Sequence, residues 1–408
     1  MTNGQKLRAF FNRKSTRAVL LLLLLSGLTA WVHSRWSAWF SNPPEAPYTV
    51  SDVPSRVMLT FGDGGETSRY VSWMCDTVVT EEAELILAHE GDTVRHAAIG
   101  EVSRSRSGKA AYYRVMLDSL QPNTEYAYQV RNGPHCSPWY TFRVHQPNED
   151  EFSFLFVGDV QDSIGGVTNT FLKRAVREHP EVEFVAFGGD LIERLTDAYW
   201  AETFRSVDSI CTAMPILNIT GNHDYLKYLI RRGERRFALV FPYFLKGMEE
   251  RGDRNHLFNL KYHGAELFCV DSERGFGFLL FQRSWLQKKI KESTAQHKIL
   301  LCHHPLYSVK HKNNNLIQRW MLDDIVGREG VDLVLQGHEH AYARCGTKPL
   351  YTISHCSPKT YRIHPTERFD KVLSGSRYYQ VITVRPNGIE MRAYDAISGE
   401  MVDRAEVH

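Results

Sequence analysis

The chain has 408 residues, and its 43% hydrophobic and 24% charged content is that of a globular protein long enough for two domains. Its formal net charge is +2, but five cations precede residue 18, so residues 50–408 carry a net charge of −3. A mildly acidic body excludes electrostatic binding to nucleic-acid backbones, and no nucleic acid is expected as a partner.

Residues 1–33 have the composition of a targeting segment. Five cations precede the apolar stretch Ala18–Val32, which contains six consecutive leucines. A basic flank before about 7–15 apolar residues is typical of a signal peptide, and the small residues of Ser26–Ala30 offer a cleavage site. Trp36 and Trp39 would instead extend the stretch into an uncleaved signal anchor. Either form predicts an extracytoplasmic body, periplasmic or secreted, which an uncleaved segment would tether to a membrane.

Residues 34–49 contain three prolines and are predicted as a linker, and residues 50–146 are predicted as an all-β domain. Short apolar runs separated by turn signals lie at residues 56–61, 70–74, 83–88, 112–117, 125–130 and 140–144. Leu120–Tyr126 resembles the tyrosine corner of fibronectin type III domains, and Trp73 stands where those domains bury a tryptophan. We therefore expect a fibronectin III-like sandwich that serves as a rigid partner of the following domain.

Residues 151–408 alternate between short apolar runs and helical patterns. The apolar runs lie at residues 152–157, 184–187, 214–219, 298–302 and 331–335, and the helical patterns lie at 167–178, 198–210 and 316–328. This alternation predicts a mostly parallel sheet with helices on its faces. Near the C-terminus, two further runs around Pro386–Gly388 predict a closing hairpin.

A polar cluster follows each of the five apolar runs. The clusters are Gly158–Gln161, Gly188–Leu191, Gly221–Asp224, Cys302–Pro305 and Gly337–His340. Alone, Asp159 could be a helix N-cap and Gly221–Asp224 an ordinary turn. Parallel sheets, however, bind ligands beyond the carboxyl ends of their strands, so we expect all five clusters to meet at one edge of the sheet.

The side chains of these clusters indicate two metal ions. The candidate ligands are Asp159, Gln161, Asp190, Asn222, His303, His338 and His340. A mixed oxygen and nitrogen set without a thiolate suits Fe, Zn, Mn or Mg. Seven ligands are too many for one tetrahedral ion but suit two ions that share a carboxylate. Two ions roughly 3.5–4 Å apart clamp both the attacking and the leaving oxygen of a phosphoryl group.

On these motifs the chain resembles the calcineurin-like metallophosphoesterase superfamily, and in Gly337–Arg344 especially the purple acid phosphatases. The resemblance covers nearly everything after about residue 50 and implies a four-layer α/β sandwich for residues 151–408. The ligands that it implies are Asp159 and His340 for the first ion, Asp190 for both, and Asn222, His303 and His338 for the second. It further implies that a hydroxide bridging the metals attacks phosphorus, while His223 contacts the phosphate and protonates the leaving oxygen.

Two positions depart from the purple phosphatase pattern. Glu193 occupies the position of the tyrosine ligand, which removes the source of the purple colour. Gln161 stands where many non-purple relatives carry a histidine, and we predict that it fills the remaining position of the first site directly or through water. His304 and His311 are candidates for substrate contact, although for both a supporting or surface role is the stronger reading.

The function predicted from these features is hydrolysis of small phosphate monoesters. A phosphodiesterase or nucleotidase on the same fold is an alternative, because both use the same metal pair. A non-catalytic surface-binding protein is an alternative of a different class.

The seven cysteines are an odd number, so at least one is unpaired within the chain. In an oxidising compartment, Cys345 and Cys356 are the preferred disulfide candidates, and Cys75 with Cys136 is the second choice.

Overall fold

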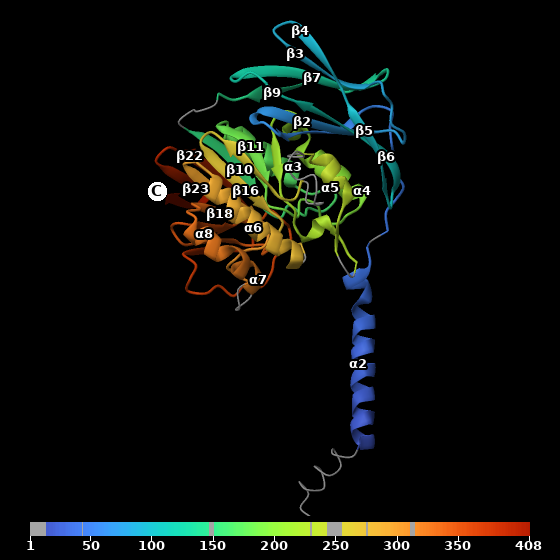
Figure 1. Ribbon diagram of the computed structural model, residues 1–408, viewed down its shortest axis with the longest axis vertical. Helices are drawn as coiled ribbons and strands as arrows, with labels where there is room; N and C mark the ends of the chain where they lie inside the picture. Colours follow the sequence, from blue (N-terminus) through green and yellow to red (C-terminus); the bar gives the residue numbers. More distant parts are fainter. Residues whose placement is uncertain are drawn as a thin grey trace, which may run out of the picture. The chain divides into compact units, whose positions relative to one another are not determined.

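The computed structural model describes residues 14–42, 44–146, 151–228, 231–242, 255–274, 276–310 and 315–408 (Figure 1). The chain divides into two compact units. One comprises residues 1–43 with 226–232, and the other comprises residues 44–225 with 233–408.

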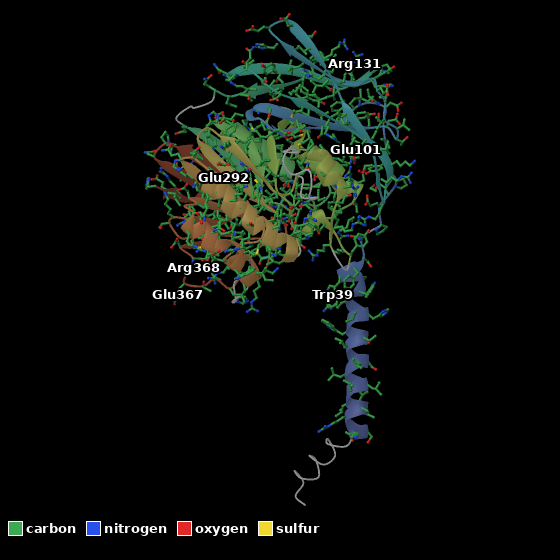
Figure 2. The ribbon with its side chains drawn as sticks, viewed as in Figure 1. Trp39, Glu101, Arg131, Glu292, Glu367 and Arg368 are labelled. Atoms are coloured by element: carbon green, nitrogen blue, oxygen red, sulfur yellow. The ribbon has the colours of Figure 1, made fainter. Side chains whose placement is uncertain are left out.

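The described part of the first unit is mainly one long helix, α2 (Lys14–Phe40). It continues beyond the predicted apolar stretch and through residues assigned to the linker, because no proline interrupts the chain before Pro43. Lys14–Ser37, with a mean hydropathy of 1.7, is long and apolar enough to cross a membrane. Trp39, which Figure 2 labels, lies in its last turn. Length and composition therefore fit a signal sequence or an anchor.

The second unit is organised around a ten-stranded sheet that runs through both of its domains. In spatial order its strands are β24 (Met401–Val407), β23 (Gly388–Asp395), β22 (Tyr378–Arg385), β10 (Phe152–Val157), β11 (Val182–Phe187), β12 (Ile216–Asn218), β1 (Ser55–Gly62), β2 (Gly65–Cys75), β6 (Gly108–Leu117) and β5 (Ile99–Ser105). The two domains join where β1 runs parallel to β12, with Thr60 opposite Ile216. The N-terminal domain is therefore fixed to the sheet of the following domain by strand pairing.

A second sheet completes the N-terminal β-sandwich. It contains β4 (Asp92–Ala97), β3 (Ala83–His89), β7 (Thr124–Asn132) and β8 (His135–Cys136), and β9 (Tyr140–Val144) also pairs with β7. In the core between the sheets, Trp73 stacks on Tyr113 with ring centroids 5.6 Å apart. The hydroxyl of Tyr126 accepts a hydrogen bond from the backbone of Gln121 (2.9 Å). This is the expected tyrosine corner, and the prediction of a fibronectin III-like domain is confirmed.

The other half of the domain formed by residues 151–408 is built on a seven-stranded sheet. Its strands in spatial order are β15 (Phe258–Tyr262), β16 (Ala265–Val270), β17 (His297–Cys302), β18 (Leu333–Gln336), β20 (Leu350–Ile353), β19 (Tyr342–Cys345) and β21 (Lys371–Leu373). Tyr262 packs against Phe61 and Phe184 of the ten-stranded sheet, with ring centroids 5.5 and 5.2 Å away. The inner faces of the two sheets thus form a shared core.

Helices cover the outer faces (Figure 1). On the ten-stranded sheet they are α3 (Thr168–Glu178) and α4 (Asp197–Cys211); on the seven-stranded sheet they are α6 (Phe276–Glu292), α7 (Leu316–Gln318), the π-helical turn η2 (Arg319–Asp323) and α8 (Asp324–Arg328). Shorter elements are η1 (Asn222–Asp224), β13 (Tyr225–Leu226), β14 (Arg232–Gly233) and α5 (Arg235–Val240). The four layers confirm the predicted α/β sandwich.

The expectation of a single sheet edge is wrong, because the five polar clusters follow strands of two sheets. The clusters after β10, β11 and β12 belong to the ten-stranded sheet, and those after β17 and β18 belong to the seven-stranded sheet. The second sheet begins with the hairpin of β15 and β16. No apolar run before this hairpin indicates that the following strands belong to another sheet. The site therefore lies where the carboxyl ends of two parallel strand sets meet.

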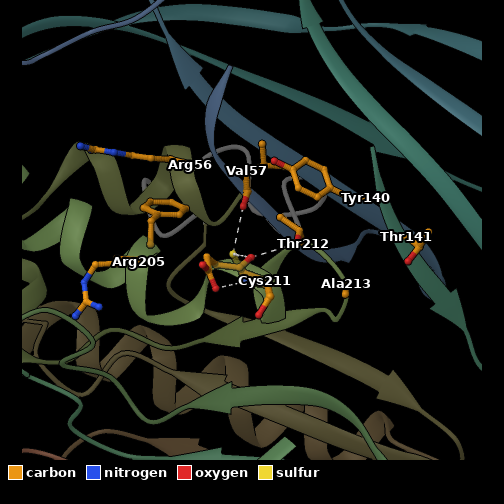
Figure 3. Close-up of a pocket in the computed structure, with 11 residues that line it drawn as sticks. Arg56, Val57, Tyr140, Thr141, Arg205, Cys211, Thr212 and Ala213 are labelled. Atoms are coloured by element: carbon orange, nitrogen blue, oxygen red, sulfur yellow. Dashed lines mark hydrogen bonds between the residues drawn. The ribbon is translucent and has the colours of Figure 1, made fainter. Parts of the chain in front are cut away.

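Polar contacts reinforce the junction between the two domains. Arg56, at the start of β1, donates two hydrogen bonds to Asp197 at the start of α4 (2.6 and 2.9 Å). Beside them, the Sγ of Cys211 donates to the carbonyl of Val57 (3.3 Å), in the wall of a cavity of about 630 Å³ between β1, β9 and α4 (Figure 3).

Part of the predicted linker is bound to this junction as well. The side chain of Glu45 is fully buried and accepts hydrogen bonds from both terminal nitrogens of Arg236 (2.9 and 3.0 Å). Burial raises the pKa of Glu45, but the hydrogen bonds and charges of Arg236, Ser107 and Arg106 together outweigh it, so the net pKa is lowered. The carboxylate therefore stays charged and holds residues near 45 to the folded unit.

Neither predicted disulfide is formed, and all seven cysteines are free thiols. Cys345 lies opposite Tyr351 at the turn end of the β19–β20 hairpin, whereas Cys356 lies beyond the open end. Five residues of extended chain separate Tyr351 from Cys356, roughly 16 Å, and a disulfide needs Cα atoms within about 7 Å. Cys75 and Cys136 belong to different sheets of the sandwich. Both predicted pairings are wrong because sequence spacing does not reveal the hairpin register.

Candidate metal centre

The ends of five strands deliver polar side chains to one place. Asp159, Asp190 and Asn222 follow the ends of β10, β11 and β12, whereas His303 and His338 follow β17 and β18. A hydrogen bond from the Nδ1 of His303 to the carbonyl of Gly188 (2.8 Å) links the two sheets at this point. The sequence clusters therefore meet as predicted, although they come from two sheets.

Asp190 lies at the middle of the group. Its Oδ2 is 3.3 Å from the Nε2 of His303, which in turn is 3.3 Å from the Oδ1 of Asn222. One ligand atom from each of Asp190, His303 and His338 lies within 4.8 Å of the others, a spacing that a metal ion can fill. These residues are those assigned to the second ion, together with the shared carboxylate.

The residues assigned to the first ion lie next to this group. The Nε2 of His340 is 3.6 Å from the Oδ1 of Asp159, and the same carboxylate oxygen is 4.0 Å from the Nε2 of His303. Gln161 joins the two halves, because its Nε2 donates to the Oδ2 of Asp190 (2.9 Å). All seven predicted ligands are thus brought together.

Two buried oxygen atoms show that this donor set fits cations. The Oδ1 of Asp159 and the Oε1 of Gln161 are buried and have no hydrogen-bond partner among the residues that the structure describes. A buried acceptor without a donor costs about 1–3 kcal/mol, and more when it is charged. A cation would satisfy both atoms at once, whereas a structural hydrogen-bond network would have left them paired.

The imidazoles present the correct nitrogen for metal binding. The Nδ1 atoms of His303 and His340 contact the carbonyls of Gly188 and Lys359 at 2.8 and 3.0 Å. A carbonyl oxygen can only accept, so both Nδ1 atoms carry the proton. Nε2 is then the nitrogen that each ring presents to a metal, which displaces any proton held there, as in most protein sites with histidine ligands.

The backbone at the site is strained. Among the candidate ligands, those with a positive φ are Asp159 (39°), Gln161 (34°), Asp190 (52°), His338 (73°) and His340 (45°). This left-handed conformation is uncommon outside glycine, and it clusters where a function requires it. Gly337 permits the close approach, since a Cβ on it would lie 2.3 Å from the Oδ2 of Asp159.

The electrostatics of the centre follow from two carboxylates buried beside imidazoles. Burial lowers the pKa of His303, but the charges of Asp190 and Asp159 outweigh it and raise the pKa to about 10. Burial and the charge of Asp190 together raise the pKa of Asp224 to about 8. After burial, the negative charge of Asp190 is therefore the largest influence on both neighbours.

His223 lies beside the centre and is held there by two hydrogen bonds. Its backbone N–H donates to the Oδ1 of Asp190 (2.7 Å), and its Nδ1 donates to the carbonyl of Glu193 (2.5 Å). The Nδ1 carries the proton for this contact, so Nε2 is the atom that remains to exchange one with a substrate. The Glu193 carboxylate itself pairs with the ammonium of Lys359 (2.5 Å).

The two weaker candidates for substrate contact have different outcomes. The ring of His304 lies 4.3 Å from that of His338, but its Nδ1 contacts the Oγ of Ser272 (2.9 Å) and its Nε2 lies 3.5 Å from the Glu273 carboxylate. These contacts support a positioning role. His311 lies outside the described residues.

The sequence reading missed three residues around the centre. Glu339 is fully buried and accepts hydrogen bonds from the Oγ of Ser308 and the backbone of Val309, both at 2.5 Å. His355 stacks on His340 with rings 5.6 Å apart, and Tyr361 covers the same ring at 4.3 Å. Glu339 lies inside the Gly337–His340 motif, so the sequence could have indicated it. His355 and Tyr361 come from a distant loop, and no motif around them indicates a role at the site.

Two family models match the chain. The model described as calcineurin-like phosphoesterase matches residues 152–342, and that described as purple acid phosphatase, N-terminal domain, matches residues 54–144.

Curated relatives point the same way. Probable purple acid phosphatase 20 of Arabidopsis thaliana is 24% identical over 60% of this chain and 58% of its own length. Fe(3+)-Zn(2+) purple acid phosphatase 12 of the same plant is 23% identical over 81% of this chain and 76% of its own length. Phosphoenolpyruvate phosphatase of Allium cepa is 23% identical over 71% of this chain and 63% of its own length. The match thus spans less than two thirds of the first and third of these relatives. Residues 152–342 thus match the calcineurin-like phosphoesterase family and residues 54–144 match the purple acid phosphatase N-terminal domain, and the chain is similar to curated proteins named as purple acid phosphatases.

Proposed function

We propose that this protein is an exported phosphoric ester hydrolase that uses two metal ions and acts on small phosphate monoesters. The observation that supports it most is the buried Oδ1 of Asp159, which has no hydrogen-bond partner among the described residues and lies beside Asp190, a carboxylate placed between two groups of donors. The relatives, named as acid phosphatases, indicate the same enzyme class.

The contacts described above support the following assignment of ligands. Asp159, Gln161 and His340 would hold one ion, Asn222, His303 and His338 would hold the other, and Asp190 would bind both. When bound, such a pair supplies Lewis acidity to the phosphoryl oxygens and lowers the pKa of a water toward neutrality. Glu193 in the place of a tyrosine provides no phenolate, and we expect a centre without a strong visible band.

The protein residues supply orientation and a proton. His223 is held by the carbonyl of Glu193 so that its Nε2 faces away from that contact, and it is the group that would protonate the leaving oxygen. Glu339 fixes the loop after β17 by accepting hydrogen bonds from Ser308 and Val309, which keeps that wall of the site in place.

The proposal is tested with the purified full chain in detergent or nanodiscs. The protein is incubated with Mn, Zn or Fe and with 4-nitrophenyl phosphate or bis(4-nitrophenyl) phosphate. We expect metal-dependent turnover that a chelator abolishes and that favours the monoester. A preference for the diester would support the phosphodiesterase alternative, and no turnover with any metal would support a non-catalytic surface-binding protein.

Gln161 offers a sharper test of the first site. Replacement by Ala removes both its free Oε1 and its hydrogen bond to Asp190, and we expect metal affinity and turnover to fall about 10- to 100-fold, as for residues that support metal ligands. Metal content after dialysis and kcat are measured together. Gln161→Glu, which keeps an oxygen donor, should retain metal. Unchanged metal content and turnover in Gln161→Ala would remove Gln161 from the site.

A further inference from the structure

Two loops bring a lysine and a tyrosine to the rim of the candidate metal centre. Tyr361, in the loop after β20, lies over the ring of His340 with centroids 4.3 Å apart and planes at 31°. Lys310, in the loop after β17, places its ammonium 3.8 Å from the centre of the Tyr361 ring. The stack of His340, Tyr361 and Lys310 therefore extends outward from a metal ligand and ends in a positive charge.

Lys310 is held in place through its backbone. Its N–H contacts the Oε2 of Glu339 (3.1 Å) and the Oγ of Ser308 (3.2 Å), and the Glu339 side chain is fully buried. Glu339 stands between the two histidines of the Gly337–His340 motif. The position of Lys310 is thus fixed by the same motif that supplies two metal ligands, and a group fixed beforehand binds with less loss of entropy.

Lys359 and Lys310 both lie near the centre, but only the charge of Lys359 is neutralised by a carboxylate among the described residues. Lys359 forms an ion pair with Glu193 (2.5 Å), so its charge is neutralised locally. Within the described ranges, no carboxylate lies within ion-pair distance of Lys310, and its ammonium lies against the face of Tyr361. An aromatic face stabilises an ammonium without neutralising it. Lys310 therefore keeps a positive charge that is available to an anion.

The Tyr361 ring also sets how far that charge lies from the centre. Its centre is 3.8 Å from the Lys310 ammonium and 4.3 Å from the centre of the His340 ring. The ammonium is therefore no more than these two distances together from a candidate metal ligand, and a substrate with two anionic groups can reach from the centre to Lys310.

We propose that Lys310, supported by Tyr361, forms an anion subsite that binds a second negatively charged group of the substrate. The inference rests on the proposed function and adds a substrate class to it: phosphate monoesters whose leaving group itself carries a carboxylate or a further phosphate. The metal ligands would take the phosphoryl group that is transferred, and Lys310 would take the second anion. A lysine suits this role because it is a point charge on a flexible stem that accepts anions of different shape.

The test compares two substrates that differ in one charge. Phenyl phosphate and 3-carboxyphenyl phosphate have leaving phenols of similar acidity, so chemistry at phosphorus is nearly the same. We expect the wild-type full chain to prefer the carboxylated ester, and Lys310→Met to lower kcat/KM for that ester by about 10- to 100-fold, the effect of losing one charge-assisted hydrogen bond. Turnover of phenyl phosphate should change little. Lys310→Arg should keep the preference, and Lys261→Met, an exposed lysine on β15, should match wild type.

A binding measurement separates the subsite from the proposed function. Calorimetry compares methylenediphosphonate with methylphosphonate, neither of which is hydrolysed. Wild type should bind the diphosphonate about 10- to 100-fold more tightly, and Lys310→Met should remove that difference. Equal losses on both esters would place Lys310 on the phosphoryl group itself and overturn the subsite, as would an unchanged preference in Lys310→Met. If wild type hydrolyses no ester, the proposed function fails, and the phosphonate pair still decides whether the subsite exists.

Discussion

Replacement of Asp190 by Asn should lower kcat/KM for phosphate monoesters by about 1,000-fold or more and reduce bound metal to less than two ions per chain. Asp190 is the carboxylate that contacts both halves of the centre, with Gln161 and His303 on its Oδ2. Lewis-acid contacts stabilise a phosphoryl transition state by several kcal/mol, and about 1.4 kcal/mol corresponds to a factor of ten. Metal analysis after dialysis and steady-state kinetics measure the two effects.

The same substitution should not unfold the protein. Burial and the charge of Asp190 hold the pKa of Asp224 at about 8, which shows that the two carboxylates repel each other in the fold. An amide at position 190 removes that repulsion but also the attraction to His303, whose raised pKa reflects the charge of Asp190, so the metal-free variant should melt lower than metal-free wild type and still be folded. A matched control is Asp208→Asn, which removes an exposed carboxylate that pairs with Lys173 on the outer helices. Asp190→Asn protein that keeps two metals and full turnover would contradict the shared-ligand assignment.

The sequence predicted the positions of the strands that carry the site well, but it did not predict how these strands are arranged in sheets. The run Phe152–Val157 matches β10 residue for residue, because a strand buried on both faces needs a continuous apolar run. The division into two sheets was not predictable from such runs, since each strand looks alike whichever sheet it joins. The pairing of β1 with the three-residue strand β12 joins residues about 156 positions apart, and no local pattern encodes it.

The candidate ligands were predictable because each follows a strand within a short motif. The contacts that position them were not, since they come from loops far along the chain. Tyr361 and Lys359 reach His340 from beyond β20, and neither lies in a recognisable pattern. The left-handed backbone of Asp159 and His338 could not be predicted either, because aspartate and histidine normally avoid that conformation. Sequence thus indicates the chemistry, and only the fold shows what holds it in place.

His223 should have a different effect from the metal ligands. It contacts Asp190 through its backbone N–H, which any substitution except proline retains, so His223→Ala should bind two metals as wild type does. Loss of its side chain removes the imidazole that the Glu193 carbonyl orients through Nδ1. A positioned acid contributes about 10²- to 10⁴-fold, and we expect a loss of that size for esters of weakly acidic alcohols.

The loss should depend on the leaving group, because an alcohol that leaves easily as an anion does not need the proton. Across a series of aryl and alkyl phosphates, the plot of log kcat/KM against the pKa of the leaving alcohol should become steeper in His223→Ala. His304→Ala is the control: its ring contacts Ser272 and Glu273 rather than a carbonyl beside the centre, so its smaller loss should be equal for all esters. Equal losses on good and poor leaving groups in His223→Ala would show that the imidazole binds the phosphate without donating a proton, because binding alone acts on every ester alike.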